Sequence, residues 1–218
     1  MRTDMQIQRD VIDELRWDPR IHAPELGVAE KDGVVTLTGT VSSYAEKWAA
    51  ERAAERVAGV KAIASELSVA LPTTHERSDT ELAHRILDAF LWDVQVPEKK
   101  IKAIVTKGWV QLDGEVEWQF QKDAAARVVR NTIGVRGMTN SLHVAPLPVS
   151  AYDVRTRIGD ALRRQAEGHA HNISVQAADS IVTLKGRVPT FAERRAAEYA
   201  AWSAPGVREV RDEILVGV

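Results

Sequence analysis

The chain has 218 residues, and 29 Lys and Arg against 31 Asp and Glu give it a formal net charge of −2. This balance excludes a strongly basic nucleic-acid binder and a protein with a long acidic tail. The sequence contains no cysteine, which excludes disulfides, thiolate metal sites and cysteine nucleophiles.

The sequence shows neither a targeting segment nor a membrane segment. Its first residues, MRTDMQIQRDVIDELRWDPR, are charged throughout and lack the apolar region of a signal peptide. No stretch approaches the roughly 18 consecutive apolar residues of a membrane helix. We therefore expect a cytoplasmic protein that contacts a membrane only peripherally.

An internal repeat divides the chain into three units. The segments GVVTLTGTV, GWVQLDGEV and SIVTLKGRV align with one another, and the flanking sequence aligns without a gap in both directions. Two glycines recur in every copy: Gly39, Gly114 and Gly186 in these segments, and Gly59, Gly134 and Gly206 farther along. We predict three domains, at residues 1–72, 76–147 and 148–218, and call them units one, two and three.

Each unit begins with the pattern of a capped amphipathic helix. Thr3 has Gln6 three residues later, and Ser78 with Glu81 and Ser150 with Asp153 repeat that spacing. In unit one the apolar residues Ile7, Val11 and Leu15 then recur every four positions. This stripe predicts a helix with one buried face.

A hairpin is predicted next. In unit one, Asp32-Gly33 is a turn signal between a short apolar segment and the alternating residues Val35, Leu37 and Val41. Gly39 stands at a strand position without a side chain, which indicates a bulge or the close approach of a packed helix.

The pattern of each unit ends with a second helix and a third strand. Ser43 and Thr190 are predicted caps, each with Glu three residues later, and the helix that follows is rich in alanine. Gly59 and its equivalents fit the first position after the helix cap, where φ is positive. The order α-β-β-α-β predicts an α+β fold: three tandem two-layer units, each with a three-stranded mixed sheet packed on two helices.

These residues resemble the BON domain family, the bacterial domain named for osmotically inducible protein Y and nodulation proteins. DGVVTLTG, KGWVQLDG and DSIVTLKG carry the resemblance, together with the helix AEKWAAERAAERVAGV and the final strands SELSV and NSLHV. The resemblance implies the αββαβ fold, and links to envelope maintenance, osmotic stress and phospholipid binding.

Nothing in the sequence indicates catalysis. His169 and His171 form the one close histidine pair, and no third ligand follows them at a fixed spacing. No nucleophile elbow, P-loop or GxGxxG pattern is present. We therefore expect no enzyme, no cofactor and no metal site.

A basic helix in unit three is the candidate surface for anionic lipid. Four arginines surround the apolar stripe of YDVRTRIGDALRRQ, and each basic residue near an anionic bilayer contributes about 1 kcal/mol. The candidates are Arg155, Arg157, Arg163 and Arg164. The alternative is a solvated helix face whose charge Asp153 and Asp160 balance.

The six tryptophans fall into two groups. Trp17 and Trp92 share one aligned position at the end of the first helix, and we expect them to pack in the core or between units. The other four, Trp48, Trp109, Trp118 and Trp202, are not matched between units, and of these Trp109 and Trp118 are the candidates for a contact with lipid or a partner.

The predicted function is a non-catalytic binding protein of bacterial stress response or envelope upkeep that binds anionic phospholipid surfaces. Two alternatives stay open, a cytosolic protein-interaction or self-assembly scaffold and a small-ion-binding stress protein. No unit is basic enough for the usual nucleic-acid footprint. Short linkers and the small size of each unit also predict packing between the units.

Overall fold

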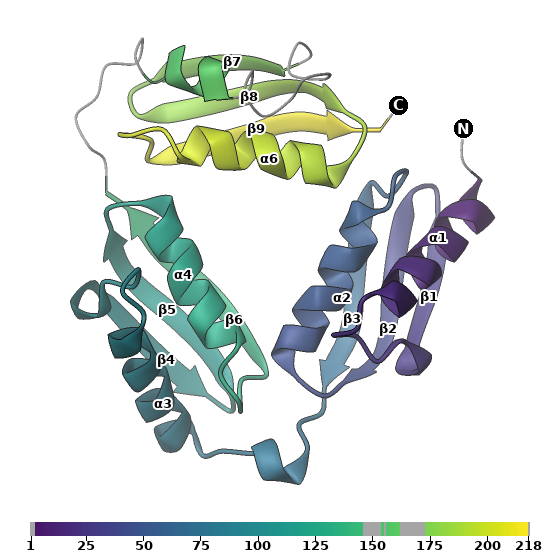
Figure 1. The fold of residues 1–218 in the computed structure, drawn as a ribbon, viewed down its shortest axis with the longest axis vertical. Coiled ribbons are helices and arrows are strands. Elements are labelled where there is room, and N and C mark those ends of the chain that lie inside the picture. The colour runs from purple at the N-terminus through teal and green to yellow at the C-terminus, as the bar shows by residue number, and fades with distance from the viewer. Residues whose placement is uncertain (1–2, 146–153, 155, 162–172, 218) are drawn as a thin grey trace.

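The computed structural model describes residues 3–145, 154, 156–161 and 173–217. In each unit the described strands form one three-stranded sheet, and the helices lie on one of its faces (Figure 1). Unit one comprises α1 (Asp4–Trp17), β1 (Leu26–Lys31), β2 (Val34–Val41), α2 (Tyr44–Arg56) and β3 (Ala62–Val69). Unit two comprises α3 (Asp79–Trp92), β4 (Ile101–Thr106), β5 (Trp109–Val116), α4 (Gln119–Arg130) and β6 (Gly137–Val144). Unit three comprises β7 (Ile173–Ala178), β8 (Ile181–Val188), α6 (Phe191–Trp202) and β9 (Glu209–Val216), and its residues 154 and 156–161 are helical.

The first helix forms as its sequence predicts. Thr3 Oγ1 accepts a hydrogen bond from the Gln6 amide, and Gln6 Oε1 accepts one from the Thr3 amide, which completes a capping box. The buried residues of α1 are the predicted stripe, Ile7, Val11 and Leu15. Ser78 caps α3 with the same box, whereas Ser150 lies outside the described residues.

The sheet of each unit is mixed, as predicted. β1 pairs antiparallel with β2, and β3 pairs parallel with β2, because α2 carries the chain back across the sheet. Asp32 and Gly33 both have positive φ, so the two-residue loop between β1 and β2 has the conformation of a tight hairpin turn. Val35 and Leu37 point into the core and are fully buried. The predicted fold class, three α+β units of order α-β-β-α-β, is confirmed.

Gly39 is needed because another backbone segment approaches it closely. Its φ is +123°, and a Cβ there would collide with the backbone carbonyl of Glu25, at the start of the neighbouring strand. Gly114 has φ +140° and the equivalent neighbour, the carbonyl of Lys100. The predicted close approach is therefore present, but it comes from the short 3-10 turn that leads into the adjacent strand (Ala23–Glu25 before β1, Glu98–Lys100 before β4) and not from a packed α-helix.

The second glycine turn that recurs in each unit lies beyond the cap of the second helix. α2 ends at Arg56 and Val57 is its C-cap, so Gly59 stands two residues past the cap and not in the first position after it. The Val60 amide donates to the Val57 carbonyl at 3.3 Å, and Gly59 takes φ +101° inside this turn. The predicted positive φ is confirmed for Gly59, Gly134 and Gly206. The predicted position is wrong by one residue at Gly59 and by two at Gly134 and Gly206, because the chain turns only after the helix has ended.

Candidate functional site

The second helices of the three units form the inner side of a ring. Figure 1 shows α2, α4 and α6 turned toward the middle of the molecule, with the sheets outside them. The start of each helix meets the end of another: α2 meets α4, α4 meets α6, and α6 meets α2. Such an arrangement places the positive end of each helix dipole near the negative end of the next.

Units one and two meet through aromatic and cationic side chains. Tyr44, the first residue of α2, packs against the hydrophobic core of unit two. The Arg130 guanidinium, at the end of α4, lies 3.7 Å from the centre of the Trp48 ring, and that of Arg52 lies 5.0 Å from it. Cations at this distance from an indole face are attracted by its π electrons.

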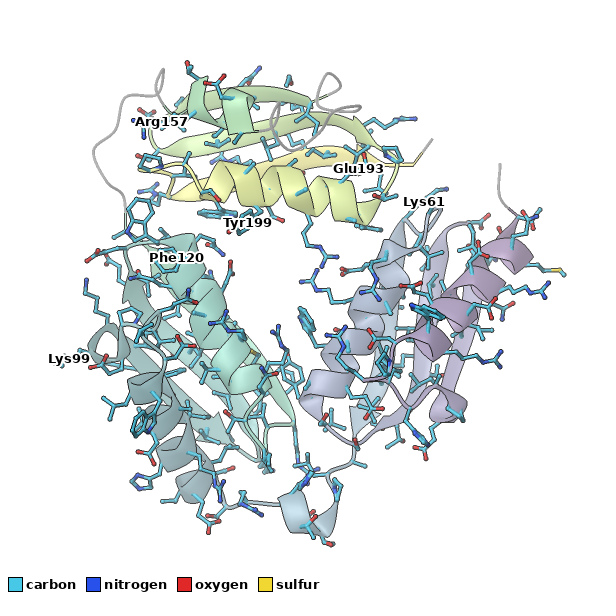
Figure 2. All side chains as sticks on the ribbon, viewed as in Figure 1. Lys61, Lys99, Phe120, Arg157, Glu193 and Tyr199 are labelled. Atoms are coloured by element: carbon cyan, nitrogen blue, oxygen red, sulfur yellow. The ribbon has the colours of Figure 1, made fainter. Side chains whose placement is uncertain are left out.

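Units two and three meet through an aromatic cluster. Trp202, the last residue of α6, packs against the cores of both units. Figure 2 shows Tyr199 of α6 and Phe120 of α4 on facing sides of this contact. Trp118, Phe120, Tyr199 and Trp202 line a crevice of about 310 Å³ there. This contact is therefore largely apolar.

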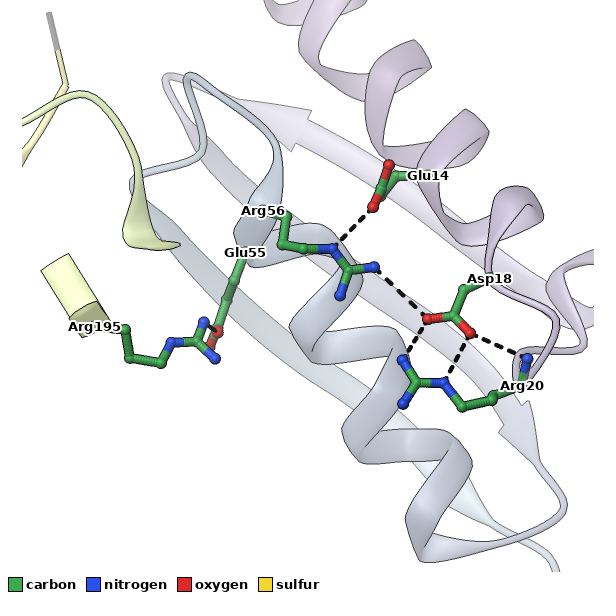
Figure 3. A network of polar contacts seen from close by, with 6 residues as sticks. All are labelled: Glu14, Asp18, Arg20, Glu55, Arg56 and Arg195. Carbon is green, nitrogen blue, oxygen red and sulfur yellow. Dashed lines mark hydrogen bonds and ion pairs between the residues drawn. The ribbon is translucent and has the colours of Figure 1, made fainter. Parts of the chain in front are cut away.

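Units one and three close the ring. Phe191, the first residue of α6, packs against the core of unit one. Arg195 forms an ion pair with Glu55 near the end of α2 (Figure 3), and Arg52 binds the same carboxylate at 2.8 Å. Burial raises the pKa of the Glu55 carboxyl, and the nearby Arg52 opposes that shift. The inter-unit packing expected from the sequence is thus present at all three joints.

We expect Phe191→Ala to open the ring between units one and three. These units are not consecutive in the chain, and the half-buried ion pair Arg195–Glu55 shares its carboxylate with Arg52, so we expect it to contribute only about 1 kcal/mol. The apolar contact of Phe191 therefore carries most of the closure. The radius of gyration from small-angle X-ray scattering should increase for Phe191→Ala and stay unchanged for Leu215→Ala, an exposed residue of the same unit. An unchanged radius for Phe191→Ala would contradict this account.

A cavity of about 750 Å³ lies where the three helices face one another. Its walls are rich in arginine and aromatic side chains, with two carboxylates. The charged and aromatic lining residues are Trp48, Arg52, Asp123, Arg127, Arg130, Arg195, Glu198, Tyr199 and Trp202. Burial lowers the pKa of Arg130, and the positive charges of Arg52 and Arg127 lower it further.

Sequence reasoning missed these cavity residues, although the repeat alignment contains a signal for them. Trp48, Asp123 and Arg195 occupy one aligned position, four residues before Arg52, Arg127 and Tyr199. The alanines that pack on the sheet recur from unit to unit, whereas these neighbouring positions change from aromatic to acidic to basic. A large side chain of changing chemistry on one helix face indicates a surface that is not part of the repeated core.

The predicted arginine cluster is only partly described by the structure. Arg155, Arg163 and Arg164 lie outside the described residues. Arg157 is exposed on the helical residues 156–161, and it forms no ion pair with the part of the chain that the structure describes (Figure 2). Arg157 is therefore available to an anionic surface.

The two unmatched tryptophans have different surroundings. Trp109 is 50% exposed on the outer sheet face, where its ring covers Gly137 of β6 and its Nε1 donates to Thr139 Oγ1 at 3.0 Å. Trp118 precedes α4 and is half-buried in the contact between units two and three. Trp118 offers no capping oxygen, so only one half of the capping box is present, in which Gln121 Oε1 accepts from the Trp118 amide at 3.1 Å.

The expectation that Trp17 and Trp92 pack in the core or between units is wrong. Trp17 is 84% exposed and Trp92 is 86% exposed. Each comes two residues after the last buried residue of its helix stripe, which turns it to the opposite helix face. In unit two the exposed residues Leu91 and Val94 flank the tryptophan, and we call Leu91, Trp92 and Val94 the Trp92 patch.

Two carboxylates are buried among the described residues, and both are structural. Glu46 accepts from the His22 amide at 2.7 Å and from the Ser42 amide at 2.8 Å, which ties α2 to the segment before β1. Asp18 is only 6% exposed; it binds Arg20 of the loop after α1 at 2.6 Å and joins α1 to α2 through Arg56, at 3.6 Å (Figure 3). The side chain and backbone amide of Arg20 and the charge of Arg56 lower the pKa of Asp18 to about 2, against the opposing effect of burial.

The described part of the chain contains no cluster of His, Asp and Glu that would hold a metal ion. The His169 and His171 pair lies outside the described residues. None of the described helices is long and apolar enough to span a membrane.

Comparison with known proteins matches the whole repeat. A family model described as BON domain matches residues 3–70, 78–146 and 152–217. The osmotically-inducible protein Y of Escherichia coli (strain K12) is 33% identical over 128 residues, which are 56% of this chain and 63% of that protein. The chain thus spans less than two thirds of the length of this relative.

Solved structures from Chlamydia trachomatis give a distant likeness. Two structures of CdsD, a structural protein of the type III secretion system, are each 13% identical with a TM-score of 0.27. One comparison covers 95% of this chain and 90% of the other; the second, to the C-terminal domain, covers 100% of both. At that TM-score neither likeness supports an inference about this chain.

Proposed function

Because the chain belongs to the BON domain family in all three of its units, we propose that it is a non-catalytic module that docks on anionic phospholipid surfaces. The name of the related protein states osmotic induction, and we extend a role in bacterial stress or envelope upkeep to this chain. The Trp92 patch is the observation that supports the docking mode.

The Trp92 patch has the properties of a shallow membrane anchor. A large apolar group that faces water costs free energy, and tryptophan favours the boundary between lipid and water. Clustered exposed apolar residues are also typical of interaction sites, whereas single ones are common on any surface. Unit one has Arg16 and Pro19 where unit two has Leu91 and Val94, so the apolar cluster is specific to unit two.

The preference for anionic lipid follows from unpaired positive charge. Arg157 is exposed and forms no ion pair with the described residues, and a basic residue near an anionic bilayer contributes about 1 kcal/mol. We assign the apolar contact to the Trp92 patch and the charge preference to the arginine-bearing helix of unit three.

We expect Trp92→Ala to weaken binding to vesicles of phosphatidylglycerol and phosphatidylcholine about thirtyfold. Moving half of an indole surface out of water is worth about 2 kcal/mol. Co-sedimentation at low and high salt measures the effect. Trp17→Ala is the matched control, since Trp17 is as exposed but has no apolar neighbours of this kind, and it should bind as the unchanged protein does.

Three results would count against lipid docking. The first is no pelleting with any vesicle, and the second is equal pelleting with neutral and anionic vesicles. The third is an equal loss for Trp17→Ala and Trp92→Ala. If the protein instead formed larger species with rising concentration and ignored vesicles, light scattering would favour the scaffold function.

A further inference from the structure

The cavity in the middle of the ring draws positive charge from all three units. Arg52 comes from α2, Arg127 and Arg130 from α4, and Arg195 from α6. Asp123 and Glu198 are the carboxylates in its lining. The four guanidinium groups therefore exceed the acidic groups of the cavity wall by two.

The ion pairs around the cavity offset this surplus, because Glu55 and Asp93 bring the nearby carboxylates to four, but they leave Arg130 without an anionic partner among the described residues. Arg52 and Arg195 share a single carboxylate, that of Glu55. Arg127 binds Asp93 at 3.1 Å, at the end of α3. Arg130 forms no ion pair with any described residue, and its cationic group rests on the Trp48 ring. A half-buried cation without an anionic partner is costly, so this site favours an added anion.

The size and chemistry of the cavity fit an organic anion. Its volume of about 750 Å³ lies within the roughly 300–1,000 Å³ of small-molecule sites. A guanidinium group presents a planar fork of N–H donors that matches the oxygens of a phosphate. The Arg130 guanidinium, which forms no ion pair with a described residue, thus has donors to offer such a ligand.

We propose that the cavity binds a small molecule carrying two or more phosphate charges. Such a ligand would accept hydrogen bonds from arginines of all three units at once and would relieve the repulsion among Arg52, Arg127 and Arg130. Its affinity depends on the closed ring, because no single unit contributes more than two of the four arginines. The cavity and the Trp92 patch share Arg127, which pairs with Asp93 beside Trp92. Arg130 lines the cavity and not the hollow beside Trp92, so Arg130→Gln tests the cavity independently of lipid docking.

Pyrophosphate is the probe for this site. In calorimetric titration at constant ionic strength we expect saturable binding to the full chain. At ten times its dissociation constant, pyrophosphate should raise the melting temperature by about 3–6 °C. We expect Arg130→Gln to weaken the affinity about tenfold, the loss of one charge-assisted contact. Arg9→Gln, which removes a positive charge from the exposed face of α1, should leave it unchanged.

A second variant and a second readout separate binding from folding. Arg127→Gln removes a different cavity arginine and should also weaken pyrophosphate binding, and circular dichroism checks that each variant is folded. The proposal is overturned if pyrophosphate does not bind saturably, or if Arg9→Gln weakens it as much as Arg130→Gln. It is also overturned if folded Arg130→Gln and Arg127→Gln both bind as the unchanged protein does.

Vesicles containing phosphatidic acid test whether the phosphate comes from a lipid headgroup. We expect Arg130→Gln to sediment with these vesicles as the unchanged protein does, and Trp92→Ala to bind pyrophosphate normally. This pair of results would show that the cavity binds a free phosphate compound and not a lipid headgroup. Loss of both pyrophosphate and vesicle binding in Arg130→Gln would contradict that assignment.

Discussion

Gly114→Ala should destabilise unit two by about 3 kcal/mol, the combined cost of an overpacked site and a strained backbone conformation. Gly114 has φ +140°, and the added Cβ would collide with the carbonyl oxygen of Lys100 and approach the Cα of Ile101. Backbone atoms on the neighbouring strand have no rotamer by which to move away. Urea unfolding followed by tryptophan fluorescence measures the change, because Trp109 lies in the same strand.

Gly217→Ala is the matched control for this substitution. Gly217 has a similar φ of +134°, but no heavy atom lies within 4 Å of the position that a Cβ would take. The difference between the two variants therefore isolates the collision from the backbone strain. If Gly114→Ala cost no more than Gly217→Ala, the close approach would not be the reason for glycine in this strand.

Asp18→Asn is expected to destabilise unit one by at most about 2 kcal/mol at neutral pH, and not at all in strong acid. The pKa of Asp18 falls from 3.8 to about 2, chiefly because the Arg20 side chain donates hydrogen bonds to the carboxylate. A lowered pKa stabilises the fold above the ordinary value of 3.8. The stabilisation is lost as the pH falls through the range from 3.8 to about 2.

Unfolding in urea across this pH range tests the prediction, with Asp13→Asn as control. Asp13 is exposed and its ion pair with Arg16 is 3.9 Å long, so its loss should change the free energy of unfolding by less than about 0.5 kcal/mol. A constant difference between Asp18→Asn and the unchanged protein down to pH 2 would show that charge is not what stabilises this joint.

The elements of the fold are predictable because their causes are local. Ile7, Val11 and Leu15 are four residues apart, and Asp32-Gly33 requires a tight turn, so both features can be read within one unit. Trp17 is exposed because it comes two residues after Leu15, and the size of a side chain does not determine its helix face. Gly39 shows a second limit of prediction from sequence. A glycine within a strand indicates that another segment lies close, but it does not identify that segment.

The candidate sites depend on contacts that a linear pattern does not contain. Arg130 is close to Trp48 only because the start of α2 meets the end of α4, and no spacing within either helix encodes that meeting. The Trp92 patch is visible in the sequence, since Leu91, Trp92 and Val94 fall within four consecutive residues. The cavity residues and the Trp92 patch both stand at positions that differ between the aligned units.

The end-to-end contacts of the second helices also determine how the molecule assembles. Each unit uses two different surfaces, one at the start of its second helix and one at the end of that helix. Every joint therefore brings together two unlike surfaces, and the ring closes with three units. Closure is self-limiting, because the last surface of unit three is occupied by the first surface of unit one. A chain opened at Phe191 presents one unoccupied surface of each kind, and two opened chains can then complete each other by exchanging units.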